Sequence, residues 1–268
     1  MRINTNLNAM TALNQSTKNT ALAGSSMGKL SSGLRINQAG DDAAGLAVSE
    51  KMRSQIRGME QADRNVQDGI SLVQTAEGAL EEAGNIAQRM RELTVQAGND
   101  TLSSTDRDKI SVELKALGEE MGKISSETKF NGQALFSGST TFTIQAGAGT
   151  ETRTIVTSDL STIATAISTL AVTSNTAAQA ATSLIDVALE GINTGRAQMG
   201  AMQNRLEATS SNLTTSTENL TAAESRIRDV DVAKEMMNLS KLNLLTQASQ
   251  AMMSQAKSQP EGVMQLLR

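Results

Sequence analysis

The sequence predicts a mainly α-helical protein built on a long antiparallel helical coiled-coil rod, with a third helix and a small β-hairpin. Two stretches far apart in the chain share a seven-residue apolar repeat, which is the period of a coiled-coil seam. Pro260 is the only proline among the 268 residues, so long helices can run without interruption. The aromatic residues are three phenylalanines, which favours thin seams between helices over a core filled by large rings.

The first repeat starts at Met52 and places a large apolar residue at every seventh position as far as Leu80. The second repeat runs in the same way from Ile185 to Ile227. In both stretches a row of mostly small residues follows three positions later, so each presents a narrow stripe to a partner helix. We interpret the two as one antiparallel pair; the alternative is two amphipathic helices in an ordinary bundle. The predicted seam contains Met52, Met59, Val66, Val73, Leu80, Leu206, Leu213, Leu220 and Ile227.

A third helix is predicted in the segment STDRDKISVELKALGEEMGKI, which starts at Ser104. Ser104 or Thr105 supplies a hydroxyl of the kind that caps a helix start. The apolar residues of this segment fall on one face, which lets the helix lie along the antiparallel pair. They are Ile110, Leu114, Leu117, Met121 and Ile124.

The pattern changes after Thr128. Residues alternate in TFTIQ and in TRTIVT, on either side of the glycine-containing AGAGTE, and predict a β-hairpin near 141–157. The dipeptide Asn131-Gly132 predicts a separate turn. All three phenylalanines lie in or beside this region, so we expect a small satellite core there. The stretch 157–182 is ambiguous between helix and loop.

The composition argues against an enzyme. The chain has no cysteine and no histidine, which removes thiol nucleophiles, imidazole bases and nearly every zinc, copper or haem site. A net charge of −4 gives no basic field for nucleic acid, and no apolar run predicts membrane insertion. Adjacent carboxylates on a helix do not face each other, so the acidic pairs predict no catalysis. These pairs are Asp41-Asp42, Glu81-Glu82 and Glu119-Glu120. We expect no catalytic residue, no metal and no cofactor.

The two ends of the chain are amphipathic, and neither has a local partner except the other. The first 40 residues hold four basic residues and no acidic one, with sparse apolar positions. A two-helix hairpin buries one side of each stripe and is marginal alone. We therefore expect the ends to pair with each other and to order when other copies of the chain cover the remaining apolar surface.

Long strings at both ends resemble a known family. The chain resembles the N-terminal part of bacterial flagellin in MRINTN, LSSGLRINQAGDDAAGLAVSEKMRSQIRG, QADRNVQDGISLVQTAEGALEE and TKFNGQALF. It is similar to the C-terminal part in IDVALEGINTGRAQMGAMQNRLE, NLTAAESRIRDVDVAKEM and LLTQASQAMMSQAKSQPEGVMQLL. The resemblance covers nearly all of the chain outside about residues 138–180, and strings of this length are far more specific than a short motif.

The resemblance implies the structural subunit that polymerises into the flagellar filament for swimming. Residues 1–42 and 235–268 are then expected to be paired helical segments of an inner tube. Residues 43–234 are expected to form the helical core domain with its hairpin. The middle is too short for extra outer domains, so a minimal flagellin is expected. The residues expected to pack in the inner tube are Ile3, Leu7, Met10, Leu244, Ala251, Val263, Leu266 and Leu267.

The family is exported unfolded through the flagellar channel without a cleaved signal peptide, which agrees with the lack of an apolar segment in MRINTNLNAM. The resemblance therefore implies an extracellular place in the filament. The implied partners are other copies of the chain, the export machinery and its chaperone, the filament cap and the hook–filament junction protein.

The segment QRMRELTVQ, residues 88–96, is a further candidate site. From its residues alone it is the end of a long helix with Met90 and Leu93 on a seam. It also resembles the flagellin surface read by Toll-like receptor 5, with methionine in place of a common valine at position 90. The same surface would serve packing between protofilaments. The candidate residues are Gln88, Arg89, Met90, Arg91, Glu92, Leu93, Gln96 and Glu113.

Two alternatives stay open. The hook–filament junction protein is a relative with similar ends, although the full run of flagellin strings argues against it. A soluble signalling rod, resembling the helical hairpin of a chemoreceptor, would also show mirrored small-residue heptads. Such a rod would not need unpartnered apolar stripes at both ends of its chain.

Overall fold

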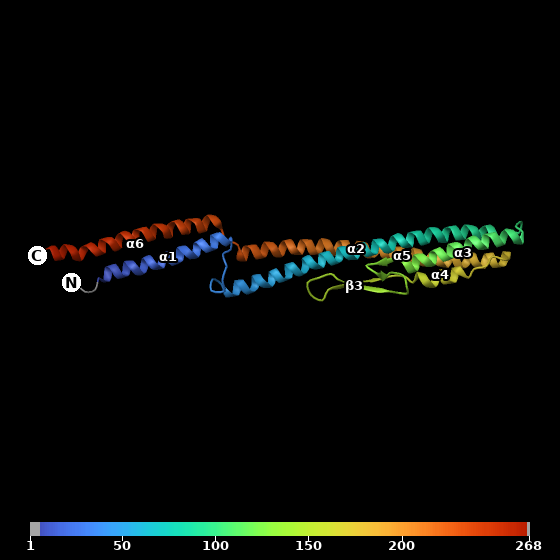
Figure 1. The fold of residues 1–268 in the computed structure, drawn as a ribbon, viewed down its shortest axis with the longest axis horizontal. Helices are drawn as coiled ribbons and strands as arrows, with labels where there is room; N and C mark the ends of the chain where they lie inside the picture. The colour runs from blue at the N-terminus through green and yellow to red at the C-terminus, as the bar shows by residue number, and fades with distance from the viewer. Residues whose placement is uncertain (1–5, 267–268) are drawn as a thin grey trace. The chain divides into compact units, whose positions relative to one another are not determined.

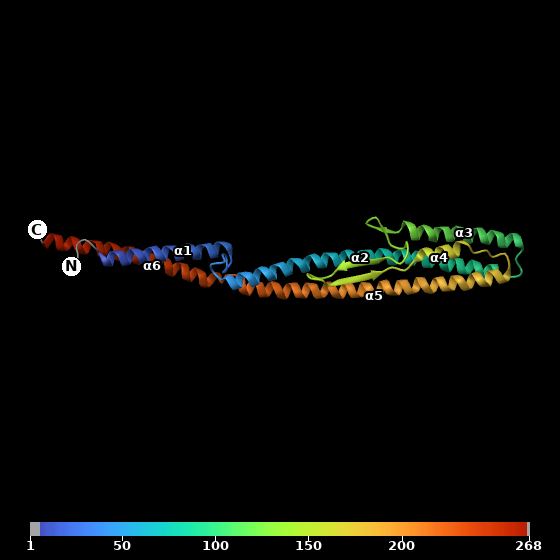
Figure 2. The ribbon, with the colours of Figure 1, turned by 90° about the horizontal axis from the view of Figure 1, so that it is seen from below.

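The computed structural model describes residues 6–266 (Figure 1 and Figure 2). These residues fall into two compact units, one from Gln55 to Glu218 and the other made of both ends of the chain, up to Ser54 and from Asn219. The units divide inside two long helices. A division near residues 42 and 235, of which the first lies just before a helix and the second in the first turn of another, stays a proposal. The elements are α1 Leu7–Ser32, α2 Ala43–Ala97, α3 Ser104–Glu127, β1 Lys129–Phe130, β2 Gln133–Ala134, β3 Thr141–Gln145, β4 Thr152–Val156, α4 Leu160–Ser168, α5 Asn175–Arg228 and α6 Val232–Leu266.

Helices α2 and α5 run antiparallel and side by side through the unit Gln55–Glu218. Near one end, Arg91 Nε on α2 lies 2.6 Å from Asp186 Oδ1 on α5. Further along, Gln67 Nε2 donates to Ser210 Oγ over 3.2 Å. The residue numbers rise along one helix as they fall along the other, so the mirrored repeats correctly predicted the direction of pairing.

The apolar core of this unit is one continuous cluster that follows the α2–α5 seam. Val66, Val73, Leu80 and Leu206 are fully buried, and Leu213 is nearly so. The other predicted seam residues, Met52, Met59, Leu220 and Ile227, are half-buried. Burial is therefore deepest in the middle of the seam and decreases toward the predicted ends.

The satellite core that we expected around the phenylalanines does not form. Phe136 is fully buried inside the same cluster as the seam, and Phe130 and Phe142 pack against that cluster. The reason is that the hairpin of β3 and β4 lies directly on α2. Its strands pair antiparallel in the predicted region, with Phe142 opposite Ile155.

Two glycines of α2 make room for this hairpin. A Cβ atom on Gly58 would lie 2.7 Å from the Cβ of Ala148, and one on Gly69 would lie 2.4 Å from Cδ1 of Ile144. Contacts this short do not occur between real side chains. A larger residue at Gly58 would meet the short, rigid Ala148 and push the hairpin away, whereas one at Gly69 would displace the end of the Ile144 side chain. Asn65 fixes the same contact by donating from Nδ2 to the carbonyl oxygen of Gln145 over 3.2 Å.

The predicted turn at Asn131-Gly132 is confirmed. Both residues have positive φ, 49° and 78°, which is the requirement of a type I′ turn between paired strands. They join β1 and β2, whose partners include Phe130 and Gln133.

Helix α3 begins at Ser104, but its cap is the preceding residue. The side chain of Ser103 accepts a hydrogen bond from the backbone N–H of Asp106. The expectation that Ser104 or Thr105 caps this helix was therefore wrong by one or two positions. The serine–serine–threonine run offers three hydroxyls, and only the backbone conformation selects among them.

The ambiguous stretch 157–182 contains a short helix, a loop and the start of α5. Helix α4 is capped by Asp159, whose carboxylate accepts from the backbone N–H groups of Ser161 and Thr162. A hydrogen bond from the Ser161 hydroxyl, and then these backbone bonds, lower the pKa of Asp159. Leu160 and Ile167 are buried in the shared core, so α4 is held by its apolar side.

Helices α1 and α6 form the main contact of the other unit, and both views show them side by side. They run antiparallel, because Asn6 Nδ2 donates to the carbonyl oxygen of Ala256 while Leu34 forms an isolated bridge with Asp229. Asn6 also caps the start of α1, and Gly33, with φ of 71°, ends it.

Among the described residues, no helix is long and apolar enough to cross a membrane. The same residues contain no group of three or more histidine, cysteine, aspartate or glutamate side chains placed to hold a metal ion.

Candidate assembly surfaces

The contact between α1 and α6 is made largely of small and polar side chains. On α1 the buried residues are Ser16, Asn19 and Ser26. On α6 the buried large side chain is Leu239, among the side chains that the structure describes. Small residues let the two backbones approach closely, but they bury little apolar area. The pair therefore gains little stability from its own contact.

Most of the large apolar residues of both helices point away from that contact. Leu7 on α1 is 61% exposed, and on α6 Met237 and Leu244 are 68% and 66% exposed. Met237, Leu244 and the exposed Ala251 lie seven residues apart, so they form one row along α6. Contiguous apolar surface of this kind marks an interaction site in a soluble protein. The other exposed large apolar residues of the two helices include Met10, Leu13, Leu22 and Met27 on α1, and Met236, Leu245 and Met252 on α6.

This row borders a shallow groove of about 650 Å³ on α6. Of the lining residues that the structure describes, Lys241 is the charged one, and the others are Met236, Met237, Ser240, Leu244, Leu245 and Ala248. Methionine fills irregular gaps easily, so such a groove can adapt to a helix laid against it.

The structure places only part of the predicted inner-tube set. Leu7, Met10, Leu244 and Ala251 lie on the exposed faces of α1 and α6. Two further predicted residues, Ile3 and Leu267, lie outside the described residues. Predicted members Val263 and Leu266 belong to α6, but their side chains also lie outside the described part of the chain.

Backbone hydrogen bonds tie together the two connections at the base of the α1–α6 pair. The N–H of Arg35 donates to the carbonyl oxygen of Arg228 over 2.6 Å, and the N–H of Val230 donates to Gly33 over 3.0 Å. The guanidinium of Arg228 then pairs with Glu50 on α2 at 2.7 Å. Hydrogen bonds from Arg228, and secondarily from Arg53, lower the pKa of Glu50.

Asp41 closes the longer of these connections. Its carboxylate accepts from the backbone N–H groups of Asn37 and Gln38, at 3.1 and 3.0 Å. These bonds, with Lys29 at 3.7 Å, lower the pKa of Asp41. The negative charge of Asp41 thus holds the turn in place.

A second candidate surface lies on α2 between α3 and α5, and two arginines define it. Arg89 reaches Glu113 on α3 and Glu92 on its own helix, each at 3.0 Å. Arg91 points to the other side and pairs with Asp186 on α5. Hydrogen bonds to Glu113, and then to Glu92, raise the pKa of Arg89. Exposed pairs of this kind add little stability, so they orient side chains more than they hold helices together.

The structure divides the eight residues predicted for this surface. Met90 and Leu93 are 0% and 2% exposed and belong to the core cluster. The other six, Gln88, Arg89, Arg91, Glu92, Gln96 and Glu113, are exposed. A protein docked on this unit can touch the six directly, whereas the two apolar residues only hold α2 in position.

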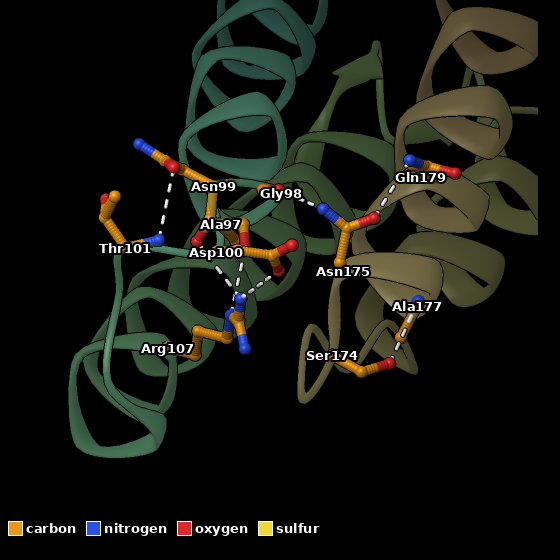
Figure 3. Close-up of polar contacts among 10 residues, drawn as sticks. All are labelled: Ala97, Gly98, Asn99, Asp100, Thr101, Arg107, Ser174, Asn175, Ala177 and Gln179. Carbon is orange, nitrogen blue, oxygen red and sulfur yellow. Dashed lines mark hydrogen bonds and ion pairs between the residues drawn. The ribbon is translucent and has the colours of Figure 1, made fainter.

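The C-terminal end of α2 is closed by side chains from two other elements (Figure 3). Arg107 on α3 donates from Nε to the carbonyl oxygen of Ala97 over 3.1 Å, and from Nη2 to that of Asn99 over 3.0 Å. The amide of Asn175, at the start of α5, donates to the carbonyl oxygen of Gly98. These bonds satisfy carbonyls that a helix end leaves free.

Sequence reasoning missed several of these polar residues. Arg35, Arg107, Asn175 and Arg228 act on backbone carbonyls or on charges far away in the sequence, and no local pattern marks such contacts. Asn19 did carry a signal. Ser16, Asn19 and Ser26 follow the three- and seven-residue spacing of a helix seam, so a polar seam could have been read from the sequence.

Family comparisons cover most of the chain. The bacterial flagellin N-terminal helical region matches residues 3–141, and the bacterial flagellin C-terminal helical region matches residues 182–267. A flagellin of Halalkalibacterium halodurans is 52% identical over 273 residues and spans the whole of both chains. A flagellin of Bacillus subtilis is 46% identical over 304 residues, again over the full length of both.

A solved structure is also similar. The crystal structure of Bacillus cereus flagellin superimposes with a TM-score of 0.50 and 32% sequence identity. The superposition covers 60% of this chain and 94% of that one.

Proposed function

The chain belongs to the bacterial flagellin family, and we propose that it polymerises into a flagellar filament through the outward apolar faces of α1 and α6. The observation that carries this proposal is the α1–α6 pair. Small polar residues are buried in its contact, whereas Leu7, Met237 and Leu244 face outward. A structural subunit of a filament needs no catalytic groups, which agrees with a chain without histidine or cysteine.

The energetics support a partner supplied by other copies. Burying one large apolar side chain contributes about 1.5–3 kcal/mol. Several such residues are exposed on α1 and α6. In a helical polymer their burial would recur at every subunit. The full-length likeness to flagellins favours a filament subunit over the hook–filament junction protein and over a signalling rod.

Seeded polymerisation followed by electron microscopy tests this proposal. Leu244→Asp places a charge in the apolar row and should prevent filament growth from added seeds. Gln247→Asp, three residues along the same helix at an exposed position, adds the same charge and should leave growth nearly intact. Equal growth of both variants would contradict the assignment of this face.

The finer parts of the family's biology also belong to the proposal. We infer export in an unfolded state through the flagellar channel without a cleaved signal peptide, with help from the export machinery and a chaperone, to an extracellular site. The filament cap and the hook–filament junction protein are the further proposed partners. A chain without cysteine cannot become cross-linked while it is extended, which suits such a route.

Recognition by Toll-like receptor 5 is a second proposed activity of the α2 surface. It is supported by the exposure of six motif residues, and by the ion pairs that hold Arg89 toward Glu113. In receptor-reporter cells, Arg89→Ala should lower the response about tenfold by removing a charged contact. Glu81 is also exposed on α2, about two helical turns before Arg89, and Glu81→Ala should leave the response unchanged. Equal responses to the two variants would remove Arg89 from the receptor contact.

A further inference from the structure

One buried amide in the α1–α6 contact has no partner for its N–H groups. Asn19 is 3% exposed, and its Nδ2 makes no hydrogen bond within the described residues. Its Oδ1 accepts from Gln15 Nε2 over 3.3 Å, so the acceptor half of the amide is used and the donor half is not. Buried donors are rarely left unsatisfied, because removing them from water without a replacement bond is unfavourable.

Asn19 lines a groove of about 630 Å³ between α1 and α6. Among the described residues, the lining contains no charged side chain and is dominated by amides, hydroxyls and small apolar groups. On α1 it consists of Asn8, Thr11, Ala12, Gln15 and Asn19, and on α6 of Leu245, Ala248, Ser249, Met252, Gln255, Ala256 and Gln259.

The chemistry of this lining selects the kind of atom that can enter. The free donor requires a hydrogen-bond acceptor. A carboxylate would have to leave water for a groove that offers no cation, which is unfavourable. Carbonyl groups in the middle of a helix are already bonded to their own backbone. A neutral side-chain carbonyl, as in asparagine or glutamine, meets all three conditions.

The groove also joins the surface that the proposed function assigns to contacts between copies. Leu245 and Ala248 line both this groove and the apolar groove beside Leu244. A helix of a second copy laid in the apolar groove therefore runs past the opening that Asn19 lines. Exposed amides are available on such a helix, for example at Asn243 and Gln250 of α6.

We propose that the α1–α6 groove is a hydrogen-bonding socket in which Asn19 Nδ2 donates to an asparagine or glutamine side chain of a second copy of the chain. This inference rests on the proposed polymerisation and names its polar contact. The apolar faces supply the area of the interface, and the Asn19 bond fixes the position of one copy along the other, as a buried asparagine does in a coiled-coil seam.

Two substitutions test the socket without altering the apolar faces. Asn19→Ala removes the amide, and Asn19→Leu keeps the branched shape of the side chain but removes the donor. Neither removes a bond donated by Nδ2, which has no partner among the described residues. Both remove the bond that Oδ1 accepts from Gln15, but Gln15 is exposed and its amide can turn to water. Because both remove an unsatisfied buried donor, neither should lower the melting temperature of the soluble protein, and both should raise the critical concentration for seeded growth about fivefold, the loss expected for one net hydrogen bond. Asn14→Ala, exposed on the same helix, should grow as the unmodified protein does.

The outcomes separate the socket from the proposed function. Failure of the unmodified chain to polymerise would contradict the proposed function itself. Normal growth of either Asn19 variant would overturn the socket alone.

Filaments grown from a mixture of ¹⁵N-labelled and ¹³C-labelled copies provide a direct check. Magnetisation transfer from Asn19 Nδ2 should reach a side-chain amide carbonyl of a neighbouring copy. Transfer to aliphatic carbons alone, or no transfer, would contradict the proposal.

Discussion

The α2–α5 seam and the α1–α6 contact are both antiparallel helix pairs, yet they use their apolar residues in opposite ways. In the seam, Val73, Leu80 and Leu206 are fully buried between the helices. In the α1–α6 contact, Ser16, Asn19 and Ser26 take the buried positions of α1, while most leucines and methionines of both helices face outward. The difference indicates that one pair is complete within a single chain, whereas the other leaves its apolar surface for further copies.

The largest expected effect is a charge placed in the complete pair. Leu206→Asp puts a carboxylate at a position with no solvent access, and it must stay ionised there or take up a proton. We expect a loss of at least about 3 kcal/mol in the free energy of unfolding of the soluble protein. Asn204→Asp introduces the same carboxylate two residues away at an exposed position, and chemical denaturation should find it nearly silent. Equal losses would show that the seam register is wrong.

The incomplete pair should respond to the same change in the opposite way. Leu13 on α1 is half exposed, so Leu13→Asp should leave the unfolding of the soluble protein unchanged and should reduce seeded filament growth. Thermal melts and growth assays on one preparation give both readings. A lowered melting temperature would mean that the α1 face is already covered within one copy.

The contrast between the two pairs could be read only in part from the sequence. The heptads at Val66, Val73 and Leu80 predicted a buried seam because packing inside one chain obeys helical periodicity. The terminal stripes at Leu7 and Leu244 have similar periodicity, but periodicity alone does not say whether a stripe faces its intrachain partner or another copy. The face that enters the contact is the one whose residues allow the two helix backbones to approach most closely. In α1 this is the face of small polar residues.

Contacts that join distant segments were the least predictable. The hairpin strands follow from local alternation, whereas the seating of the hairpin on α2 depends on Gly58 and Gly69, which look like ordinary helix glycines in the sequence. Likewise, the chain has many charged residues, and nothing in the sequence indicates that Arg228 pairs with Glu50 in particular. In the eight-residue candidate surface, the positions of α3 and α5 decide which residues are buried and which are exposed, and the sequence does not give those positions.

An intermediate effect is expected where the hairpin meets α2. Gly58→Ala forces a methyl group against Ala148 and should lower the free energy of unfolding by about 1–3 kcal/mol. Gly78→Ala in the same helix meets open space and should raise that free energy by about 0.5–1 kcal/mol through better helix propensity. Urea unfolding of the two variants checks this. Destabilisation by both would mean that helix glycines here share a role other than seating the hairpin.

The smallest expected effect is a pH dependence at the base of the α1–α6 pair. The pKa values of Asp41 and Glu50 are lowered in the folded chain, so their contribution is present above the ordinary carboxyl pKa near 4 and is lost as pH falls through the lowered values. Amide protection of residues 33–54, corrected for intrinsic exchange, should therefore weaken below about pH 4. Asp41→Asn should show a smaller change with pH. An unchanged dependence in that variant would remove Asp41 from this explanation.

Loss of the C-terminal segment should separate the two pairs in one experiment. A chain that lacks about its last 20 residues loses part of α6 and its apolar side chains, which contribute roughly 1.5–3 kcal/mol each when fully buried. Seeded growth should stop, while circular dichroism melts should still report the folded unit from Gln55 to Glu218. Normal filaments from the truncated chain would contradict the role assigned to this end.

Hydrogen exchange on the soluble protein and on the filament tests the comparison most directly. If other copies complete the α1–α6 pair, amides in residues 7–32 and 232–259 should exchange rapidly in the soluble protein and slowly in the filament. Amides along the buried α2–α5 seam, around Val73 and Leu206, should exchange slowly in both. Slow exchange of α1 and α6 in the soluble protein would show that the pair is already stable alone, and would contradict the account.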